Sequence, residues 1–223
     1  MTGRAVLAAV LLLAAGCAGV PPLTPVGPET AERLRAECPA VYPTGRWELV
    51  HSVIATPPGG GRRVAMGALA VDAGAATLRL SMMTPEGFVL VDAGWADGRT
   101  EIHRAVPPFD DPALVEGIVA DLRLLSFPPA PAPDRIGRTQ GGAARCRYRP
   151  GPGETVDVIP LPDGWEIRRY HDGRPHRTIR ATGLDDQIPR TVELTGHGPL
   201  GYRLRLTLVS ARQVPAGTPP PTP

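Results

Sequence analysis

The stretch TLRLSM, residues 77–82, indicates the fold because apolar and polar side chains alternate along it. Leu78, Leu80 and Met82 would lie on one face of a β-strand, with polar residues on the other. The same period of two recurs in further segments: 47–55, 62–71, 87–95, 99–106, 144–149, 155–161, 165–171, 176–182, 190–195 and 202–210. Asp97-Gly98, Asp163-Gly164 and Asp172-Gly173 are typical of hairpin turns. The sequence therefore predicts a large antiparallel sheet.

One clear helix separates two groups of strands. Asp110 and Asp111 can cap it, and Pro112 suits its first turn. Apolar side chains at 114, 115, 118, 119, 122 and 125 follow the helical period, and Glu116, Asp121 and Arg123 fall outside this stripe. A shorter helix is predicted over residues 28–38, before Pro39.

A sheet of this size determines the expected architecture. Ten or more twisted strands curl rather than stay flat, and the concave face of the curl needs an apolar cover. The central helix is the only such cover that the pattern offers. We therefore expect a mainly β fold with one or two helices, in which a curled antiparallel sheet forms an open half-barrel covered by the central amphipathic helix.

The first 17 residues, MTGRAVLAAVLLLAAGC, have the layout of a secretory signal. Arg4 precedes an apolar run that is shorter than the roughly 20 residues needed to cross a bilayer. The run ends in LAAGC, which resembles the bacterial lipobox, so Cys17 is the predicted lipidation site, carrying a diacylglycerol and an N-acyl chain such as palmitate. The alternative is an ordinary cleaved signal followed by a chance cysteine. Ala18, where an Asp would favour the inner membrane, favours the outer membrane.

The chain is accordingly divided into four parts. We expect a signal peptide at 1–16, a lipidated proline-rich tether at 17–28, a single domain at 29–212 and a disordered proline-rich tail at 213–223. The expected location is the cell envelope, with the protein anchored to the outer membrane and facing the periplasm.

Three cysteines fit an exported protein. If Cys17 is acylated, Cys38 and Cys146 remain, and an even remainder in an oxidising compartment suggests a disulfide. Two buried free thiols are the alternative.

The composition excludes several functions. The net charge is only +2, and all 24 basic residues are arginine, so we expect no nucleic-acid partner. A chain without lysine has no Walker-type phosphate loop and no Schiff-base chemistry. No serine lies in a Gly-x-Ser-x-Gly motif, and the histidines form no His-Glu-x-x-His motif. We therefore predict a protein that is not an enzyme, with no catalytic residue, no metal ligand and no cofactor.

Arginine is distributed unevenly along the chain. Residues 17–134 hold 9 arginines against 14 acidic residues, and residues 135–223 hold 14 against 8. Arg145, Arg147 and Arg149 would share one strand face, and Arg203 and Arg205 another. Such a face could meet anionic lipid headgroups or an acidic partner, or it could simply be solvated.

Several stretches resemble a known family. They are GWEI at 164–167, IPRTVEL at 188–194, YRLRLTLV at 202–209, LRLSMMTPEGFVLV at 78–91 and LVEGIVADLRLLSFP at 114–128. In this order they resemble the LolB lipoprotein receptor and, more widely, the LolA/LolB-like outer-membrane lipoprotein superfamily. The N-terminal helix, the cysteine pair and the proline-rich loop at 128–133 depart from the receptor pattern. The resemblance implies a half-barrel that shelters acyl chains.

The residues that would line such a half-barrel are apolar. The predicted lining consists of Met66, Leu78, Leu80, Met82, Val89, Leu114, Ile118, Leu122, Trp165, Ile167, Leu204 and Leu206. We expect an outer-membrane lipoprotein that binds lipid or an acylated lipoprotein during envelope assembly. The alternative is a structural or interaction lipoprotein of an envelope complex, with a solid core and no ligand, because apolar alternation more often marks plain core.

Overall fold

The computed structural model describes residues 19–198 and 201–215. The signal peptide, Cys17 and most of the proline-rich tail lie outside the described residues. In chain order the elements are β1 (Thr24–Pro25), α2 (Pro28–Glu37), η2 (Pro39–Val41), β2 (Arg46–Thr56), β3 (Arg63–Asp72), β4 (Thr77–Met83), β5 (Val89–Ala96), β6 (Arg99–Ala105), α3 (Pro112–Ser126), β7 (Arg135–Arg138), β8 (Ala144–Tyr148), β9 (Glu154–Leu161), β10 (Gly164–His171), β11 (Arg174–Asp185), β12 (Ile188–Gly196) and β13 (Tyr202–Val214).

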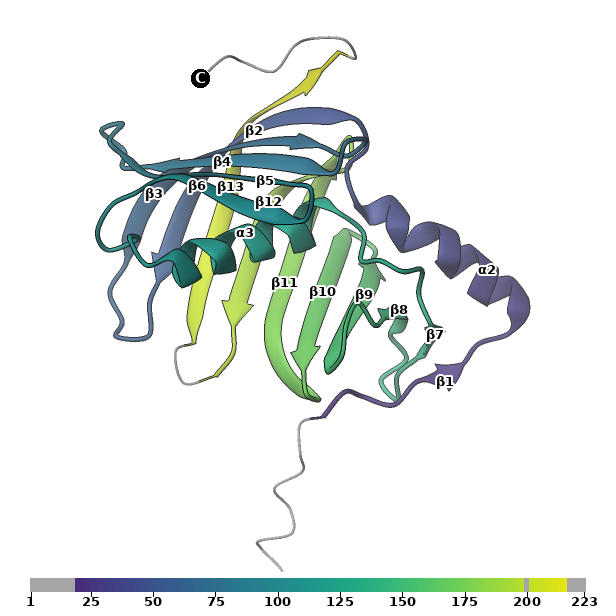
Figure 1. The fold of residues 1–223 in the computed structure, drawn as a ribbon. Coiled ribbons are helices and arrows are strands. Elements are labelled where there is room, and N and C mark those ends of the chain that lie inside the picture. The colour runs from purple at the N-terminus through teal and green to yellow at the C-terminus, as the bar shows by residue number, and fades with distance from the viewer. Residues whose placement is uncertain (1–18, 199–200, 216–223) are drawn as a thin grey trace, which may run out of the picture.

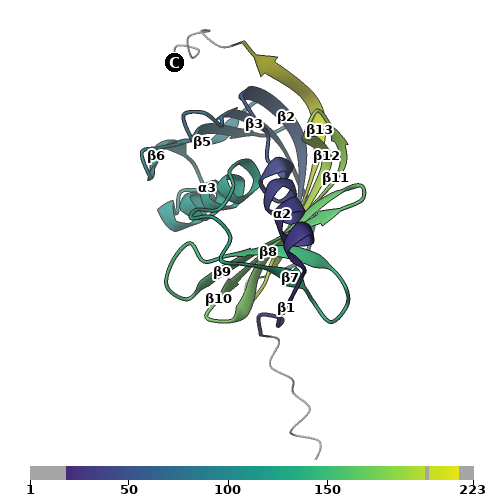
Figure 2. The same cartoon turned by 90° about the vertical axis from the view of Figure 1, so that its right-hand side faces the viewer.

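All strands belong to one antiparallel sheet. Its order is β1-β7-β8-β9-β10-β11-β12-β13-β2-β3-β4-β5-β6, with β1 and β6 as the two edges. The long strand β13 joins the two halves, since its register with β2 runs from Arg203 opposite Thr56 to Val214 opposite Arg46. Register shifts in the β4–β5, β5–β6, β10–β11 and β13–β2 pairs add local bends. The predicted fold class, a curled and open sheet with a helix, is confirmed (Figures 1 and 2).

The central helix α3 lies inside the curve of the sheet (Figure 2). Its N-terminus is capped as the sequence predicts, because the side chain of Asp111 accepts a hydrogen bond from the backbone N–H of Ala113 at 2.9 Å. Pro112 occupies the first turn, where its missing N–H leaves no partner unsatisfied. Val115, Val119 and Leu122 are buried on the side of the helix that faces the sheet.

A second helix also covers the concave face, although the sequence pattern left α3 as the only cover. The short helix α2 packs against β7 and β8. Leu34 and Cys38 belong to the same buried cluster as Trp165 and Ile167. We call this set the α2 cluster, and the one beneath α3 the α3 cluster.

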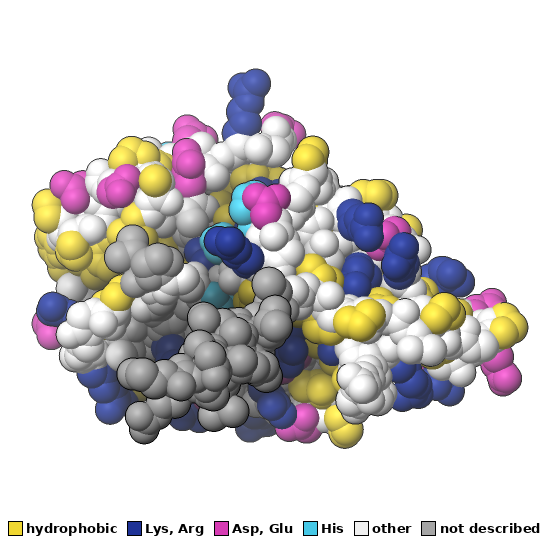
Figure 3. Space-filling view, turned by 90° about the horizontal axis from the view of Figure 1, so that it is seen from below, with side chains coloured by type: hydrophobic (Ala, Val, Ile, Leu, Met, Phe, Trp, Pro, Cys, Tyr) yellow, Lys and Arg dark blue, Asp and Glu magenta, His cyan; other side chains and the backbone are white. Residues whose placement is uncertain are grey.

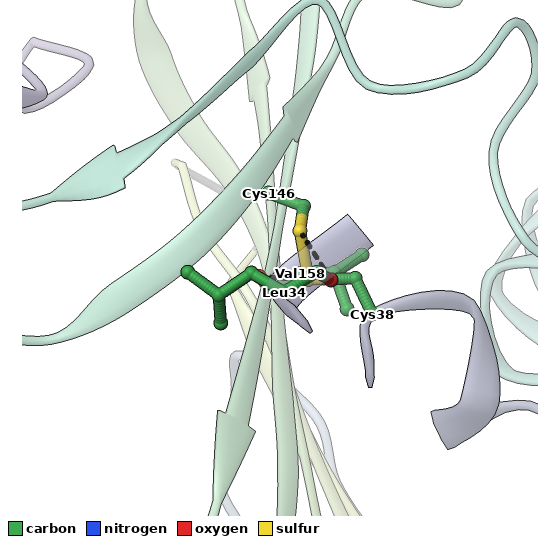
Figure 4. Close-up of a disulfide and its surroundings, with 4 residues drawn as sticks. All are labelled: Leu34, Cys38, Cys146 and Val158. Carbon is green, nitrogen blue, oxygen red and sulfur yellow. Dashed lines mark hydrogen bonds between the residues drawn. A yellow bond between two sulfur atoms is a disulfide. The ribbon is translucent and has the colours of Figure 1, made fainter. Parts of the chain in front are cut away.

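A disulfide fixes α2 to the sheet. Cys38 follows the last residue of α2 and Cys146 lies in β8, and the two sulfurs are bonded across 108 residues of sequence. The Cys146 Sγ also lies 3.3 Å from the carbonyl oxygen of Leu34 (Figure 4), which is a contact only, since a disulfide sulfur has no proton to donate. Closing so long a loop is expected to stabilise the fold by about 4–5 kcal/mol.

The arginines that sequence analysis placed on a basic surface have other partners. Arg145 and Arg147 are buried, and both donate to the fully buried carboxylate of Asp157. Arg149 pairs with Asp134, and Arg205 lies near Glu193. The first two arginines therefore belong to a buried ion-pair network, because directly cross-strand neighbours of opposite charge bring their side chains together.

Two short strands were missed from the sequence. β7 has only four residues, RIGR, and β1 has two, so neither carries an alternating pattern long enough to detect. β1 pairs with β7 through Thr24 opposite Arg138 and Pro25 opposite Gly137. The proline-rich segment before α2 is thus attached to the sheet edge from Thr24 onward. No helix in the described part of the chain has the length and apolar character needed to cross a membrane.

Candidate functional site

The interface between α3 and the concave face of the sheet is the candidate site. On one side of α3 the contact is apolar, where Val115, Val119 and Leu122 pack within a cluster that includes Leu80 and Val91. Arg123 places its guanidinium 4.1 Å from the centre of the Trp95 ring of β5, a distance that favours a cation–π interaction. Burial lowers the pKa of Arg123 from its ordinary value, with a smaller contribution from Arg169.

On its other side α3 is held by polar contacts. The buried carboxylate of Asp121 accepts hydrogen bonds from Arg177 Nε of β11 at 2.9 and 3.2 Å. It also accepts one from Tyr202 Oη of β13 at 2.5 Å. We call these three residues the Asp121 latch. It joins the middle of α3 to two strands from the opposite half of the sheet.

The latch keeps Tyr202 in its donor form. Burial, and then the nearby Asp121 carboxylate, raise the pKa of the Tyr202 hydroxyl above its usual value, so the phenol stays protonated. Arg177 also places its guanidinium 5.2 Å from the Tyr202 ring centre and donates to the carbonyl oxygen of His176. The three side chains thus form one connected network rather than separate pairs.

One end of the concave face is only partly covered. Inward-facing side chains near the β2–β3 and β12–β13 connections are half-buried, namely Val53, Ala55, Ala65, Leu204 and Leu206. We call this set the open end. Figure 3 looks onto this end of the molecule, where apolar and histidine side chains are visible beside charged ones.

His51 lies between the open end and the filled α3 cluster. It stands opposite Gly67 of β3 and Leu208 of β13. Its side chain is buried, and this burial lowers its pKa to about 4. A neutral imidazole therefore occupies the step from packed core to half-exposed wall at neutral pH.

The best-formed pockets of the described residues lie elsewhere. One of about 660 Å³ lies at the ends of β4, β5 and β6, and one of about 510 Å³ lies between η2 and the β9–β10 turn. No residue of α3 lines either of them. The space that a half-barrel would offer to a ligand is therefore filled by the side chains of α3 itself.

The structure divides the predicted lining residues into groups. Five are packed core, in the α3 cluster or the α2 cluster: Leu78, Leu80, Leu122, Trp165 and Ile167. Five are half-buried: Met82, Val89, Ile118, Leu204 and Leu206.

Two predicted lining residues are misplaced. Met66 stands opposite Ser52 and Met83, one residue out of phase with the inward-facing Leu69, so it lies on the convex face. Leu114 is 42% exposed, because it lies on the first turn of α3 beyond the buried stripe.

The sequence analysis missed the latch. It placed Asp121 outside the apolar stripe, as a solvent-facing residue, whereas the structure buries it. The signal was present, because Ile118, Asp121 and Leu125 follow the i, i+3, i+7 positions of one helix face. Among the described residues no cluster of three or more His, Cys, Asp or Glu is arranged to hold a metal ion.

Comparison by sequence finds no matching family model and no matching curated protein. Comparison of structures finds a LolA superfamily protein from Nitrosomonas europaea with a TM-score of 0.50 and 10% identity, covering 83% of this chain and 94% of that one. An outer membrane lipoprotein-sorting protein domain from Vibrio parahaemolyticus aligns with a TM-score of 0.46 and 12% identity, over 86% of this chain and 94% of that one. The sequence is thus far diverged while the sheet and its helices are kept. This chain has the fold of the LolA superfamily.

Proposed function

We propose that this protein is a bacterial outer-membrane lipoprotein that binds an acyl chain, of a lipid or an acylated lipoprotein, against the concave face of its sheet. The observation that carries the proposal is the position of α3, which lies inside the half-barrel and is held there by non-covalent contacts alone. In this view the helix occupies the acyl site, and it moves when an acyl chain enters. The protein performs no chemistry on its ligand.

The energetics support an exchange between helix and acyl chain. Burying one methylene group contributes about 0.8 kcal/mol, so a chain of sixteen carbons contributes roughly 10 kcal/mol when fully enclosed. That is comparable to the contribution of the buried side chains of α3, at about 1.5–3 kcal/mol each for Val115, Val119 and Leu122. Neither state then dominates by a wide margin, which is what transient binding requires.

The open end supports a point of entry. Its side chains are apolar and half-exposed, and it lies next to the Asp121 latch through Tyr202 and Leu204 of β13. An acyl chain that enters there meets Leu204 and Leu206 first and reaches His51 next. Release of the latch then frees α3 to move away from the α3 cluster.

The envelope location rests on the N-terminal segment. The apolar run ending in LAAGC and the residue Ala18 support acylation of Cys17 and transfer to the outer membrane, with the domain facing the periplasm. Metabolic labelling with palmitate in a bacterial host tests this. The wild-type chain should incorporate label and Cys17→Ser should not, whereas label in both would refute acylation at Cys17.

The ligand proposal is tested by binding. A chain that begins at Ala18 keeps every described element and both core clusters, so it contains the whole folded unit. Native mass spectrometry of this chain should show co-purified lipid, and a fluorescent fatty acid should bind at one site per molecule. A clean protein mass together with no fatty-acid binding, at temperatures where α3 exchanges its amide protons, would refute the proposal.

A second function is favoured by the packed interior. The α2 and α3 clusters are filled, and the two best-formed pockets of the described residues lie outside the helix–sheet interface. These facts support a structural or interaction lipoprotein of an envelope complex that binds no ligand. The fatty-acid experiment separates the two functions, because a solid core takes up no probe.

A further inference from the structure

One end of the molecule carries three strand connections and the first described residues. Figure 1 shows the β2–β3, β10–β11 and β12–β13 connections at the bottom of the view, and the described chain starts at the same end. The strand registers agree, since Arg203 of β13 stands opposite Thr56 at the end of β2, and Arg174 begins β11 opposite His171. This is also the end at which the concave face is only partly covered.

Four arginines project from these connections. Arg62, Arg63, Arg174 and Arg203 are exposed, and none has an ion pair or side-chain hydrogen bond to another described residue. We call them the arginine rim. Elsewhere on the surface, exposed arginines have acidic neighbours, as in the Arg190–Asp185 pair.

The rim has little acid to balance it. The segments 57–63, 171–174 and 196–203 contain these four arginines and three histidines but only one acidic residue, Asp172. Asp172 lies 3.5 Å from His171, so it is not paired with an arginine. The rim is therefore a patch of uncompensated positive charge, which complements an anionic surface.

The N-terminal segment leaves the domain beside this rim. Arg147 Nη2 donates a hydrogen bond to the carbonyl oxygen of Pro21 at 2.9 Å, and β1 pairs with β7 from Thr24. The chain is thus attached to the sheet from Pro21 onward. The four residues back to Cys17 span at most about 14 Å when fully extended. An acyl group on Cys17 would hold this end of the domain close to the lipid surface, within reach of the Debye length of roughly 8 Å.

We propose that the arginine rim docks the protein on a membrane surface by binding anionic lipid headgroups, with the open end facing the bilayer. This deepens the proposed function, on which it rests for the presence of the anchor. An acyl chain that leaves the bilayer would then meet the half-exposed apolar wall directly, without crossing water. Guanidinium groups suit this role because each can bind a phosphate through two parallel hydrogen bonds.

The test uses the chain that begins at Ala18, so that no acyl group or signal segment contributes to binding. Sedimentation with vesicles of phosphatidylcholine, with or without phosphatidylglycerol, gives the partition coefficient. Each arginine near an anionic surface contributes about fivefold, so R63Q/R174Q/R203Q should bind anionic vesicles at least tenfold more weakly than the parent. The matched control R35Q/R99Q/R180Q removes the same charge from exposed arginines that lie outside the rim, and it should change binding less than about threefold.

The outcomes separate this inference from the proposed function. Equal weakening by the two triple variants would show attraction by net charge alone and would overturn the rim. The rim is equally overturned if the parent chain binds both kinds of vesicle alike or binds neither. Fatty-acid binding in free solution does not depend on the vesicle result. A rim that fails while fatty acid still binds therefore leaves the carrier function standing, and the converse result refutes the carrier function alone.

Discussion

The Asp121 latch offers the most direct test of how α3 is held. Asp121→Asn keeps the shape of the side chain but removes the charge that Arg177 and Tyr202 share. Hydrogen bonds to a charged group contribute about 1.5–3 kcal/mol each, and Arg177 is only 15% exposed, so solvent screens the contact weakly. Taking the lower value for two partners, the substitution should favour the displaced helix by about 3 kcal/mol. That is roughly a hundredfold change in the open population.

Hydrogen exchange followed by mass spectrometry measures this population. Amide protons of α3, residues 112–126, should exchange roughly a hundredfold faster in Asp121→Asn, whereas those of β9 and β10 should keep their rates because the disulfide-linked half does not depend on the latch. Fatty-acid affinity should rise as well, since the competent state is more populated. Glu116→Gln is the matched control, because Glu116 is exposed on the same helix and has no part in the latch.

Two results would refute this reasoning. If α3 in Asp121→Asn exchanges no faster than in Glu116→Gln, the latch does not hold the helix. If every peptide of the chain exchanges faster by the same factor, the latch contributes to global stability only, and α3 does not open independently.

Three further predictions concern stability. Reducing the Cys38–Cys146 disulfide should lower the free energy of unfolding by about 4–5 kcal/mol, measured by urea denaturation with and without reductant, and a loss below 1 kcal/mol would contradict the loop-closure argument. The pKa of His51 is about 4 when folded and near 6.5 when unfolded, so the unfolded chain binds the extra proton and stability falls as pH drops from 6.5 towards 4. Between pH 6.5 and 5 His51→Leu should therefore lose about 2 kcal/mol less than wild type, and identical pH profiles would refute burial as the cause. Asp157→Asn should cost about 3–5 kcal/mol in the same urea assay because it leaves Arg145 and Arg147 buried without their counter-charge, and a cost near zero would show that water reaches the pair.

The strand pattern could be predicted because it is local. Alternation over six or more residues specifies a face, and a two-residue turn specifies the next strand. Asp97-Gly98 and Asp172-Gly173 take the left-handed conformation at both positions, as hairpin turns of this kind require. Asp163-Gly164 was predicted to do the same but does not, because Pro162 and Asp163 form that turn and Gly164 already belongs to β10.

Gly164 has a different reason to be glycine. A Cβ at this position would lie 2.0 Å from the carbonyl oxygen of Ala181, so the close approach of β11 excludes any side chain. The sequence shows a glycine after an aspartate in both situations. Only the packing of the neighbouring strand distinguishes a turn glycine from a glycine required by close contact.

The parts that could not be predicted are non-local. The pairing of β13 with β2 joins Val214 to Arg46, and no local pattern indicates which strand lies beside which. The Asp121–Arg177 contact spans 56 residues and the Asp121–Tyr202 contact spans 81. A polar residue in an apolar helix stripe can be recognised, but its partners are fixed only when the sheet has curled.

The two helices on the concave face are held by different means, and this difference bears on function. α2 is joined to β8 by a covalent bond, whereas α3 is held by an apolar cluster and by the ion pair of Asp121 with Arg177. A buried ion pair commonly contributes less to stability than well-packed apolar side chains of the same size. An apolar residue at position 121 would continue the stripe and hold the helix more firmly. A contact that is specific in geometry but weaker than apolar packing suits a helix that must leave its site and return to the same position, and the covalent bond is found in the half of the sheet that has no such need.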